Sequence, residues 1–210
     1  MLKTAEPGND AEDPLSYVKD TTLEWCSNYG TFVTADGKRY EVKKDLTPRT
    51  VRISGDLNFA GQNVTVRGLK LRYLNERNIF ANGMPLTINY DVEIAKEGNA
   101  ANYPTIYGGG NWPVGSTNLT VMSGNYRYIY GGGASEKGRV TGDTKLLLSD
   151  KPVSVIAGNS LVGTAQKQSQ ITADGVFGGG KGYVNGNTEV SVYTGTYGWL
   201  YGGGFGGNGT

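Results

Sequence analysis

Apolar residues recur at every second position in short runs from residue 51 onward, and glycines stand between many of the runs. Strict alternation over a few residues is the pattern of a half-buried β-strand, and glycine marks turns between strands. The runs are Val51-x-Ile53, Leu57-x-Phe59, Val64-x-Val66, Leu69-x-Leu71, Leu86-x-Ile88 and Val92-x-Ile94. The pattern therefore predicts an all-β fold of short strands.

A second pattern, an apolar residue followed by an aromatic residue and three glycines, repeats in the later part of the chain. Full copies lie at residues 106–110, 129–133, 176–180 and 200–204, a worn copy at 79–83 and a degenerate copy at 156–159. From Ile106 onward the leading apolar residues are 23, 27, 20 and 24 residues apart, about 23.5 on average. This spacing fits one coil of a parallel β-helix.

A Gly-x-Thr strand precedes three of these corners at a constant distance. The strands at 115–121, 142–148 and 186–192 each begin 14 residues before the apolar residue of the next corner. Because alternate residues of a strand share a side, Thr117, Leu119 and Val121 should face the core together, as should their counterparts. We expect the threonines to form a buried ladder with hydroxyl hydrogen bonds along the stack. Asn118, Lys145 and Glu189 should face water.

The length of the chain varies between the glycine run and the next Gly-x-Thr strand. The pieces of variable length are residues 111–113, 134–139 and 181–183, and all three should project from one edge. In repeat proteins such insertions often form the binding face.

The 210 residues are expected to form one elongated unit. We expect a flexible leader at 1–13, an N-terminal cap with a β-hairpin at 14–44, and a β-helix of roughly six or seven coils at 45–210, by the coil length above. The sequence stops just after a corner. We therefore expect either that the natural protein continues or that the open C-terminal coil associates end to end with another molecule.

Composition excludes several functions. Twenty basic and nineteen acidic residues give a net charge of +1, so nucleic acid is not an expected partner. The absence of histidine excludes histidine-based triads and histidine-ligated metals, and the single Cys26 excludes a thiolate cluster. No apolar run reaches membrane-spanning length, so membrane insertion is not expected.

Residues 53–57 and 68–71, followed by the Gly-x-Thr and Tyr-Gly-Gly-Gly repeats, resemble a family of bacterial surface and adhesin-like proteins. These proteins have a right-handed parallel β-helix of the pectin-lyase-like class, and the resemblance covers residues 45–210. It implies a right-handed solenoid and a secreted or cell-surface location. The same fold also carries polysaccharide lyases, polygalacturonases and phage tailspikes. None of their catalytic motifs matches this chain, so we expect no catalytic residue, cofactor or metal ligand.

Aromatic residues of the corner repeat are the candidate ligand-binding residues. If the leading Ile or Val points inward, strand alternation turns the aromatic residue that follows it outward, where its ring could stack on a sugar. Alternatively, the rings stack on one another and stabilise the coils. The candidates are Tyr107, Tyr130, Phe177 and Tyr201 in one column, with Tyr128 and Trp199 two residues earlier.

Three functions remain open at this point. The preferred hypothesis is a non-enzymatic extracellular module for adhesion or structural display, whose partner is a glycan or a host or cell surface. The first alternative is a polysaccharide lyase-like or hydrolase-like enzyme, which would need clustered carboxylates. The second alternative is a self-assembling filament protein that grows through its open C-terminal coil.

Overall fold

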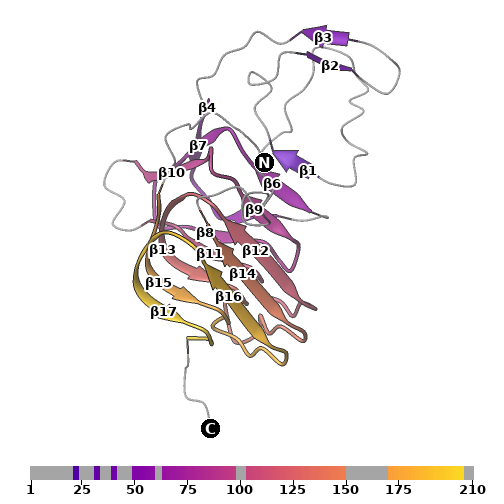
Figure 1. Ribbon diagram of the computed structural model, residues 1–210, viewed down its shortest axis with the longest axis vertical. Helices are drawn as coiled ribbons and strands as arrows, with labels where there is room; N and C mark the ends of the chain where they lie inside the picture. Colours follow the sequence, from indigo (N-terminus) through magenta and orange to yellow (C-terminus); the bar gives the residue numbers. More distant parts are fainter. Residues whose placement is uncertain are drawn as a thin grey trace.

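The structure is a computed structural model that describes residues 21–23, 31–33, 39–41, 49–59, 63–97, 103–149 and 170–205. Every regular element in these ranges is a β-strand, and none is a helix. The strands form three parallel sheets and one antiparallel hairpin (Figure 1). The all-β prediction is confirmed, and the presence of three parallel sheets is consistent with a β-helix.

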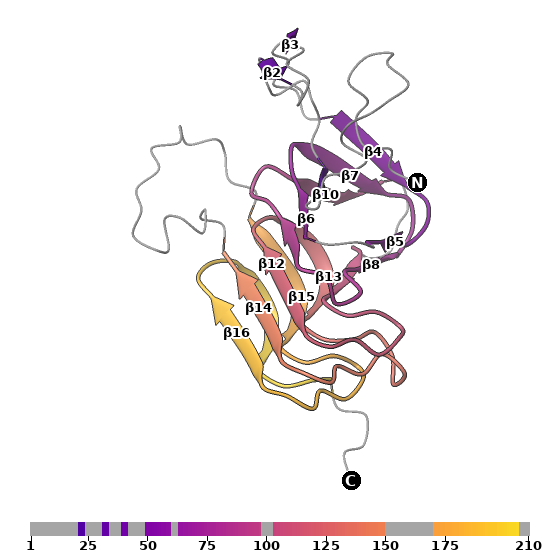
Figure 2. The ribbon, with the colours of Figure 1, turned by 90° about the vertical axis from the view of Figure 1, so that its right-hand side faces the viewer.

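The first sheet has six parallel strands. Figure 2 shows four of them, β6, β12, β14 and β16, along one side of the molecule. In spatial order they are β1 (Thr21–Leu23), β6 (Val64–Val66), β9 (Leu86–Ile88), β12 (Thr117–Val121), β14 (Thr144–Leu148) and β16 (Thr188–Val192).

The other two parallel sheets have three and six strands. The second sheet comprises β4 (Arg49–Ile53), β7 (Leu69–Tyr73) and β10 (Glu93–Lys96). The third comprises β5 (Leu57–Asn58), β8 (Asn78–Phe80), β11 (Thr105–Tyr107), β13 (Gly124–Tyr130), β15 (Ile171–Phe177) and β17 (Thr196–Tyr201).

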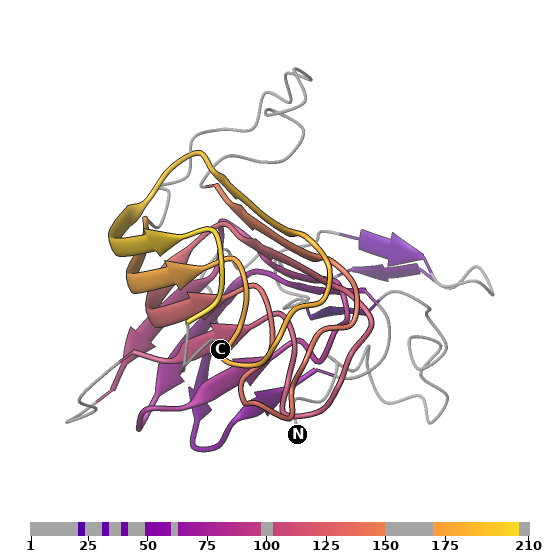
Figure 3. The same ribbon diagram turned by 90° about the horizontal axis from the view of Figure 1, so that it is seen from below.

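The chain visits the sheets in a fixed order. It passes through the first, second and third sheets in β6, β7 and β8, and again in β9, β10 and β11. We call one such passage a layer. Each strand pairs in parallel with its equivalent in the neighbouring layer. Figure 3, seen along the stack, shows the strands and loops of successive layers lying over one another.

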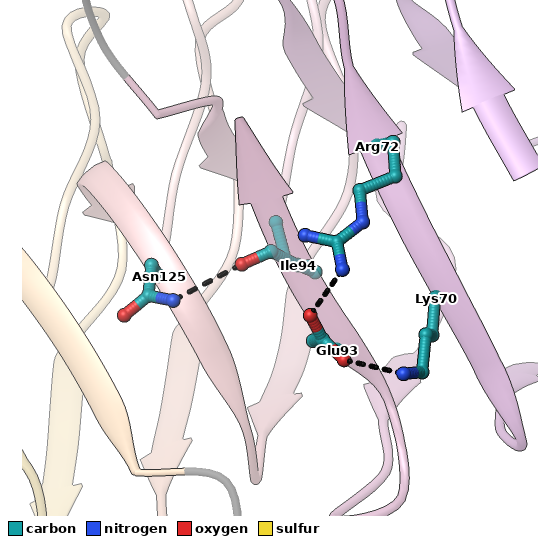
Figure 4. Close-up of polar contacts among 5 residues, drawn as sticks. All are labelled: Lys70, Arg72, Glu93, Ile94 and Asn125. Carbon is teal, nitrogen blue, oxygen red and sulfur yellow. Dashed lines mark hydrogen bonds and ion pairs between the residues drawn. The ribbon is translucent and has the colours of Figure 1, made fainter. Parts of the chain in front are cut away.

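The second sheet ends at β10. In the later layers its position is occupied by the first residues of β13 and β15, which are longer strands. Asn125, near the start of β13, donates from Nδ2 to the carbonyl oxygen of Ile94 in β10 at 3.1 Å (Figure 4). Thr172 of β15 in turn donates from its hydroxyl to Oδ1 of Asn125 at 2.5 Å. Later layers therefore have one long strand where earlier layers have two strands and a corner.

The predicted register of the Gly-x-Thr strands is confirmed. Thr117 pairs with Thr144, and Thr144 with Thr188, in adjacent strands of the first sheet. In both β12 and β14 the first, third and fifth residues are buried, as alternation predicts, whereas in β16, the last described strand of this sheet, Thr188 and Val192 are exposed. Asn118, Lys145 and Glu189 share one register position on the exposed face.

The hydrophobic core lies between the three sheets and receives residues from every layer. Its members in β6, β7 and β8 include Val66, Leu71 and Ile79, each at most 1 % exposed. Full burial of such a side chain contributes about 1.5–3 kcal/mol relative to exposure. The core is therefore assembled layer by layer, and each layer covers the one before it.

In the sequence, the degenerate corner copy at 156–159 lies between two layers that are adjacent in the structure. These residues lie outside the described ranges, but β13 pairs directly with β15, and β14 pairs directly with β16. Ile129 and Val176 are therefore neighbours in the third sheet, although 47 residues separate them in sequence. The expected coil at 156–159 therefore has no counterpart among the strands that the structure describes. The worn copy at 79–83 does form a layer, since Ile79 pairs with Ile106.

The predicted N-terminal hairpin is present as β2 (Thr31–Val33) and β3 (Arg39–Glu41), which pair antiparallel. Strand β1 pairs in parallel with β6 and forms one edge of the first sheet. The expected leader at 1–13 lies outside the described residues.

Candidate functional site

A ladder of stacked aromatic rings runs along the third sheet. Its members occupy equivalent positions in five successive strands, and we call them the aromatic ladder: Phe80, Tyr107, Tyr130, Phe177 and Tyr201. Neighbouring ring centroids are 5.5, 4.9, 4.8 and 5.3 Å apart, and the interplanar angles are 22°, 4°, 12° and 7°. Near-parallel rings at these separations attract one another beyond the area they bury.

The first four rings of the ladder, from Phe80 to Phe177, are buried, with 1–4 % of each residue exposed. They face away from the core that Ile106 and Ile129 enter, as alternation predicts, but they form a second apolar cluster. Tyr128 and Ala134 pack against this cluster, and Nζ of Lys181 lies 5.7 Å from the Tyr107 ring centroid. The interpretation of the column as mutual stacking is therefore confirmed.

The six candidate ligand-binding residues have different environments. Tyr107, Tyr130 and Phe177 are inner rings whose faces are covered by their neighbours in the ladder. Tyr128 is half-buried and lies with its ring tilted against Tyr130 at 6.0 Å. Open ring surface is found at Trp199 and Tyr201 in β17, which are 57 % and 52 % exposed.

Burial also changes the acidity of the ladder phenols. Desolvation is the main cause that raises the pKa of Tyr107 to about 12, and the carboxylate of Glu76 adds to the effect. Burial likewise raises the pKa of Tyr130 well above its ordinary value. Both hydroxyls therefore keep their protons at pH 10, where half of the ordinary tyrosine side chains are ionised.

The glycine triplets let the backbones of successive layers touch. A Cβ on Gly108 would overlap the carbonyl oxygen of Gly131, and a Cβ on Gly131 would overlap that of Gly178. The amide of Gly131 donates to the carbonyl oxygen of Phe177 at 2.8 Å in the same stack. Glycine is required here because there is no room for a side chain between the layers.

The threonine ladder is tied to these triplets. The hydroxyl of Thr117 donates to the carbonyl oxygen of Gly131 at 2.6 Å, and that of Thr144 donates to Gly178 at 2.7 Å. Both hydroxyls are buried, so the bonds fasten the first sheet to the third across the layer. The sequence predicted buried hydroxyl bonds but placed them along the threonine stack.

A shallow hollow of about 260 Å³ lies at the corner before β12 and β14. Its polar lining includes Ser116, Asn118, Asp143 and Lys145. Oδ1 of Asp143 accepts a hydrogen bond from the Asn187 amide at 2.8 Å, and Oγ of Ser116 accepts one from the Asp143 amide at 3.2 Å. These side chains therefore hold the corner of one layer on the next.

The acidic side chains of the second sheet and its corner face arginine or lysine. Glu93 lies 2.7 Å from Arg72 and 3.3 Å from Lys70 (Figure 4), and Glu97 lies 2.9 Å from Arg52. Within the described ranges, no group of three or more Cys, Asp and Glu residues could hold a metal ion. We find no clustered carboxylates free for catalysis in this part of the chain.

The structure exposes two aromatic residues that the sequence did not single out. Trp112 is 72 % exposed and Tyr183 is 70 % exposed, in the first and third of the predicted edge loops. Parallel bridges join Val114 to Val140 and Val140 to Val184, directly after the three loops. The loops therefore share one edge, as predicted. The recurrent valine just before each Gly-x-Thr was the signal that could have aligned these rings.

Comparison with known proteins gives no match: no family model, no curated protein and no solved structure resembles this chain. Nor do the described residues include a helix that is long and apolar enough to span a bilayer. The class of protein must therefore be argued from the fold and from the environment of its side chains.

Proposed function

We propose that the chain is a right-handed parallel β-helix that serves as a non-enzymatic module of a secreted or cell-surface protein, for adhesion or structural display. The solenoid is supported by the fixed order in which the chain visits the three sheets, always with parallel pairing. Right-handed crossovers are the rule for parallel strands of one sheet, which supports the hand.

One observation carries the non-enzymatic assignment: the repeated side chains hold the layers together. The glycines touch neighbouring backbones, Thr117 and Thr144 bond to glycine carbonyls, and the inner ladder rings stack on one another. A repeat whose recurring residues mostly contact the neighbouring layers makes a rigid support. Function then belongs to the surfaces that differ from layer to layer.

The test is to compare binding with turnover. The fluorescently labelled chain is applied to an array of neutral and acidic glycans and to intact cells, and the same glycans are assayed for new reducing ends and unsaturated products. We expect saturable binding without cleavage. Cleavage that is lost in Asp143→Asn or Glu189→Gln, but kept in Asp56→Asn, would instead establish the enzyme.

End-to-end self-association is a second candidate, favoured by the exposed apolar residues at and just after β17, the last strand that the structure describes. Leu200 in β17 is 52 % exposed, whereas its equivalents Ile129 and Val176 are fully buried. Trp199, Tyr201 and Phe205 beside it are each more than half exposed. An apolar strand edge of this kind readily pairs with another chain.

Sedimentation velocity over a wide concentration range tests this candidate. Association should grow with concentration and disappear in Leu200→Lys. The control is Leu74→Lys, which adds the same charge at an exposed leucine on another part of the surface. A monodisperse monomer at the highest concentration would dismiss self-association and leave the display function untouched.

A further inference from the structure

The three edge loops enter and leave their layers in register. The amide of Ala134 donates to the carbonyl oxygen of Gly110 and that of Lys181 to Gly133, so the loops begin together. The amide of Val114 then donates to the carbonyl oxygen of Arg139 at 3.0 Å, and that of Val140 to Tyr183 at 2.8 Å. Pro113, Arg139 and Tyr183 thus occupy one column in three successive layers.

The side chains on this edge are aromatic and basic. We define the edge patch as Trp112, Lys137, Arg139, Lys181 and Tyr183, all of them exposed. Successive layers are about 4.8 Å apart, so Pro113, next to Trp112, lies about 10 Å from Tyr183 with Arg139 between them. The backbone register therefore places Tyr183 one layer from Arg139, and Trp112 directly before the same column in the layer on the other side.

The patch carries uncompensated positive charge. Arg139 forms no ion pair with any residue the structure describes, whereas Arg52, Arg72 and Arg127 each face a glutamate. Lys137 is likewise without an ion pair in those ranges, and Glu136 is the one acidic residue in the three loops. A partner at this edge is therefore expected to be acidic.

The backbone beneath the patch is fixed before any partner arrives. A Cβ on Gly138 would overlap the carbonyl oxygen of Gly110, and a Cβ on Gly182 would overlap that of Ser135. The middle loop also closes on itself, since the amide of Gly138 donates to the carbonyl oxygen of Ser135 at 2.9 Å. Exposed rings on a preorganised backbone lose little entropy on binding.

From this arrangement we propose that the edge patch is a docking site for an acidic, extended protein segment. Trp, Tyr and Arg are the residue types that carry most of the binding energy in protein interfaces, and they meet here on one edge. The three loops have twelve residues together, whereas a standard interface between globular proteins has roughly 20–30 residues on each side. A short segment with several carboxylates and an apolar anchor fits the patch, and this site goes beyond the display function proposed above.

The probe is a fluorescein-labelled heptapeptide of six glutamates around a central leucine, followed by fluorescence anisotropy. We expect saturable binding that weakens with added salt and is absent for the same peptide with glutamine in place of glutamate. Tyr183→Ala, Trp112→Ala and Arg139→Gln should each weaken binding at least about tenfold, as hot-spot residues do. Far-UV circular dichroism confirms that each variant is folded.

Matched variants outside the patch decide where the probe binds. Tyr193→Ala removes an exposed ring and Lys145→Gln an exposed cation, both away from the edge loops, and neither should change binding. Equal weakening by Lys145→Gln and Arg139→Gln would overturn the proposal, as would no saturable binding at millimolar peptide. Tighter, patch-dependent binding of hyaluronan oligosaccharides or oligo(dT) would replace the protein segment by a glycan or a nucleic acid. None of these results decides the proposed display function, which is tested separately by the glycan array and the cell-binding assay.

Discussion

The hydroxyl of Thr117 donates a 2.6 Å hydrogen bond to the carbonyl oxygen of Gly131, 14 residues further along the chain. This bond joins the start of a first-sheet strand to the corner that ends the third-sheet strand of the same layer. Thr144 repeats the contact with Gly178 one layer later, although 34 residues separate these two in sequence. The equivalence of the two bonds shows that the layer, and not the sequence spacing, is the structural unit.

Replacing Thr117 by valine keeps the shape of the side chain and removes the donor. The buried carbonyl oxygen of Gly131 loses this partner, so Thr117→Val should lower the free energy of unfolding by about 1–3 kcal/mol. Urea unfolding monitored by circular dichroism measures the change. Thr120→Val, on the other face of the same strand, is the control and should change stability by less than about 0.5 kcal/mol. Equal effects would show that the hydroxyl bond contributes nothing specific.

The aromatic ladder should be sensitive to truncation at its centre. Tyr130 stacks on Tyr107 at 4.9 Å and on Phe177 at 4.8 Å, so Tyr130→Ala leaves a cavity between two rings. We expect a loss of about 3–5 kcal/mol. Tyr201→Ala, at the half-exposed end of the ladder, should lose clearly less in the same denaturation experiment. A larger loss at Tyr201 than at Tyr130 would contradict the role of the buried stack.

Adding one methyl group should lower stability at the glycines that contact a neighbouring layer, and not at the other glycines. Gly131→Ala places a Cβ against the carbonyl oxygen of Gly178, so the layers must move apart or the strand must shift. Overpacking of this kind is expected to lower stability by about 1–3 kcal/mol. Gly55→Ala is the matched control, since no atom lies within 4 Å of its added Cβ. Thermal unfolding of the two variants, side by side, measures the difference.

Alkaline pH should weaken the fold through the buried phenols. The pKa of Tyr107 is raised from 10.0 to about 12, chiefly by burial, with a smaller contribution from Glu76 that Arg127 partly opposes. Between these two values the unfolded chain loses the proton and the folded chain keeps it. The unfolded state then binds fewer protons, so stability is full below pH 10 and falls as the pH rises toward 12.

Urea unfolding at a series of pH values from 8 to 11 measures this dependence. Tyr107→Phe removes the ionisable hydroxyl and should flatten the decline. The comparison uses the slope of stability against pH, so any change in stability that is independent of pH cancels. An identical slope in both proteins would contradict the raised pKa of Tyr107 in the folded state, because this residue would then contribute nothing to the pH dependence of stability.

The local register could be predicted from the sequence, because strand alternation and the Gly-x-Thr spacing are both local rules. Thr117, Thr144 and Thr188 align as expected, and even the worn copy at Ile79 takes its place beside Ile106. The direct pairing of Ile129 with Val176 across 47 residues was not predicted, since sequence spacing cannot distinguish residues that fill a coil from residues that connect two adjacent layers. That distinction depends on which strands pair, and pairing is a long-range property.

The environment of the candidate site was harder to predict. Alternation placed Tyr107 and Tyr130 on the outer side of their strands, yet Tyr128, Ala134 and Lys181 cover them there. These covering residues come from the same strand and from two different loops, so no short pattern contains them. Trp112 and Tyr183 escaped notice for a related reason, because they lie in loops of different sequence and only the bridges between Val114, Val140 and Val184 align them.

The contact of glycine backbones between equivalent corners also bears on how such a chain can change over generations. Gly131 meets Gly178 as Gly108 meets Gly131, so the two ends of any whole layer offer the same backbone surface. A recombination event that joins one corner to another would delete or duplicate a complete layer and leave the remaining contacts in register. The length of such a chain can then vary by whole layers. Inserting or deleting one residue within a strand would instead shift the alternation of that strand and disturb its contacts with the neighbouring layers.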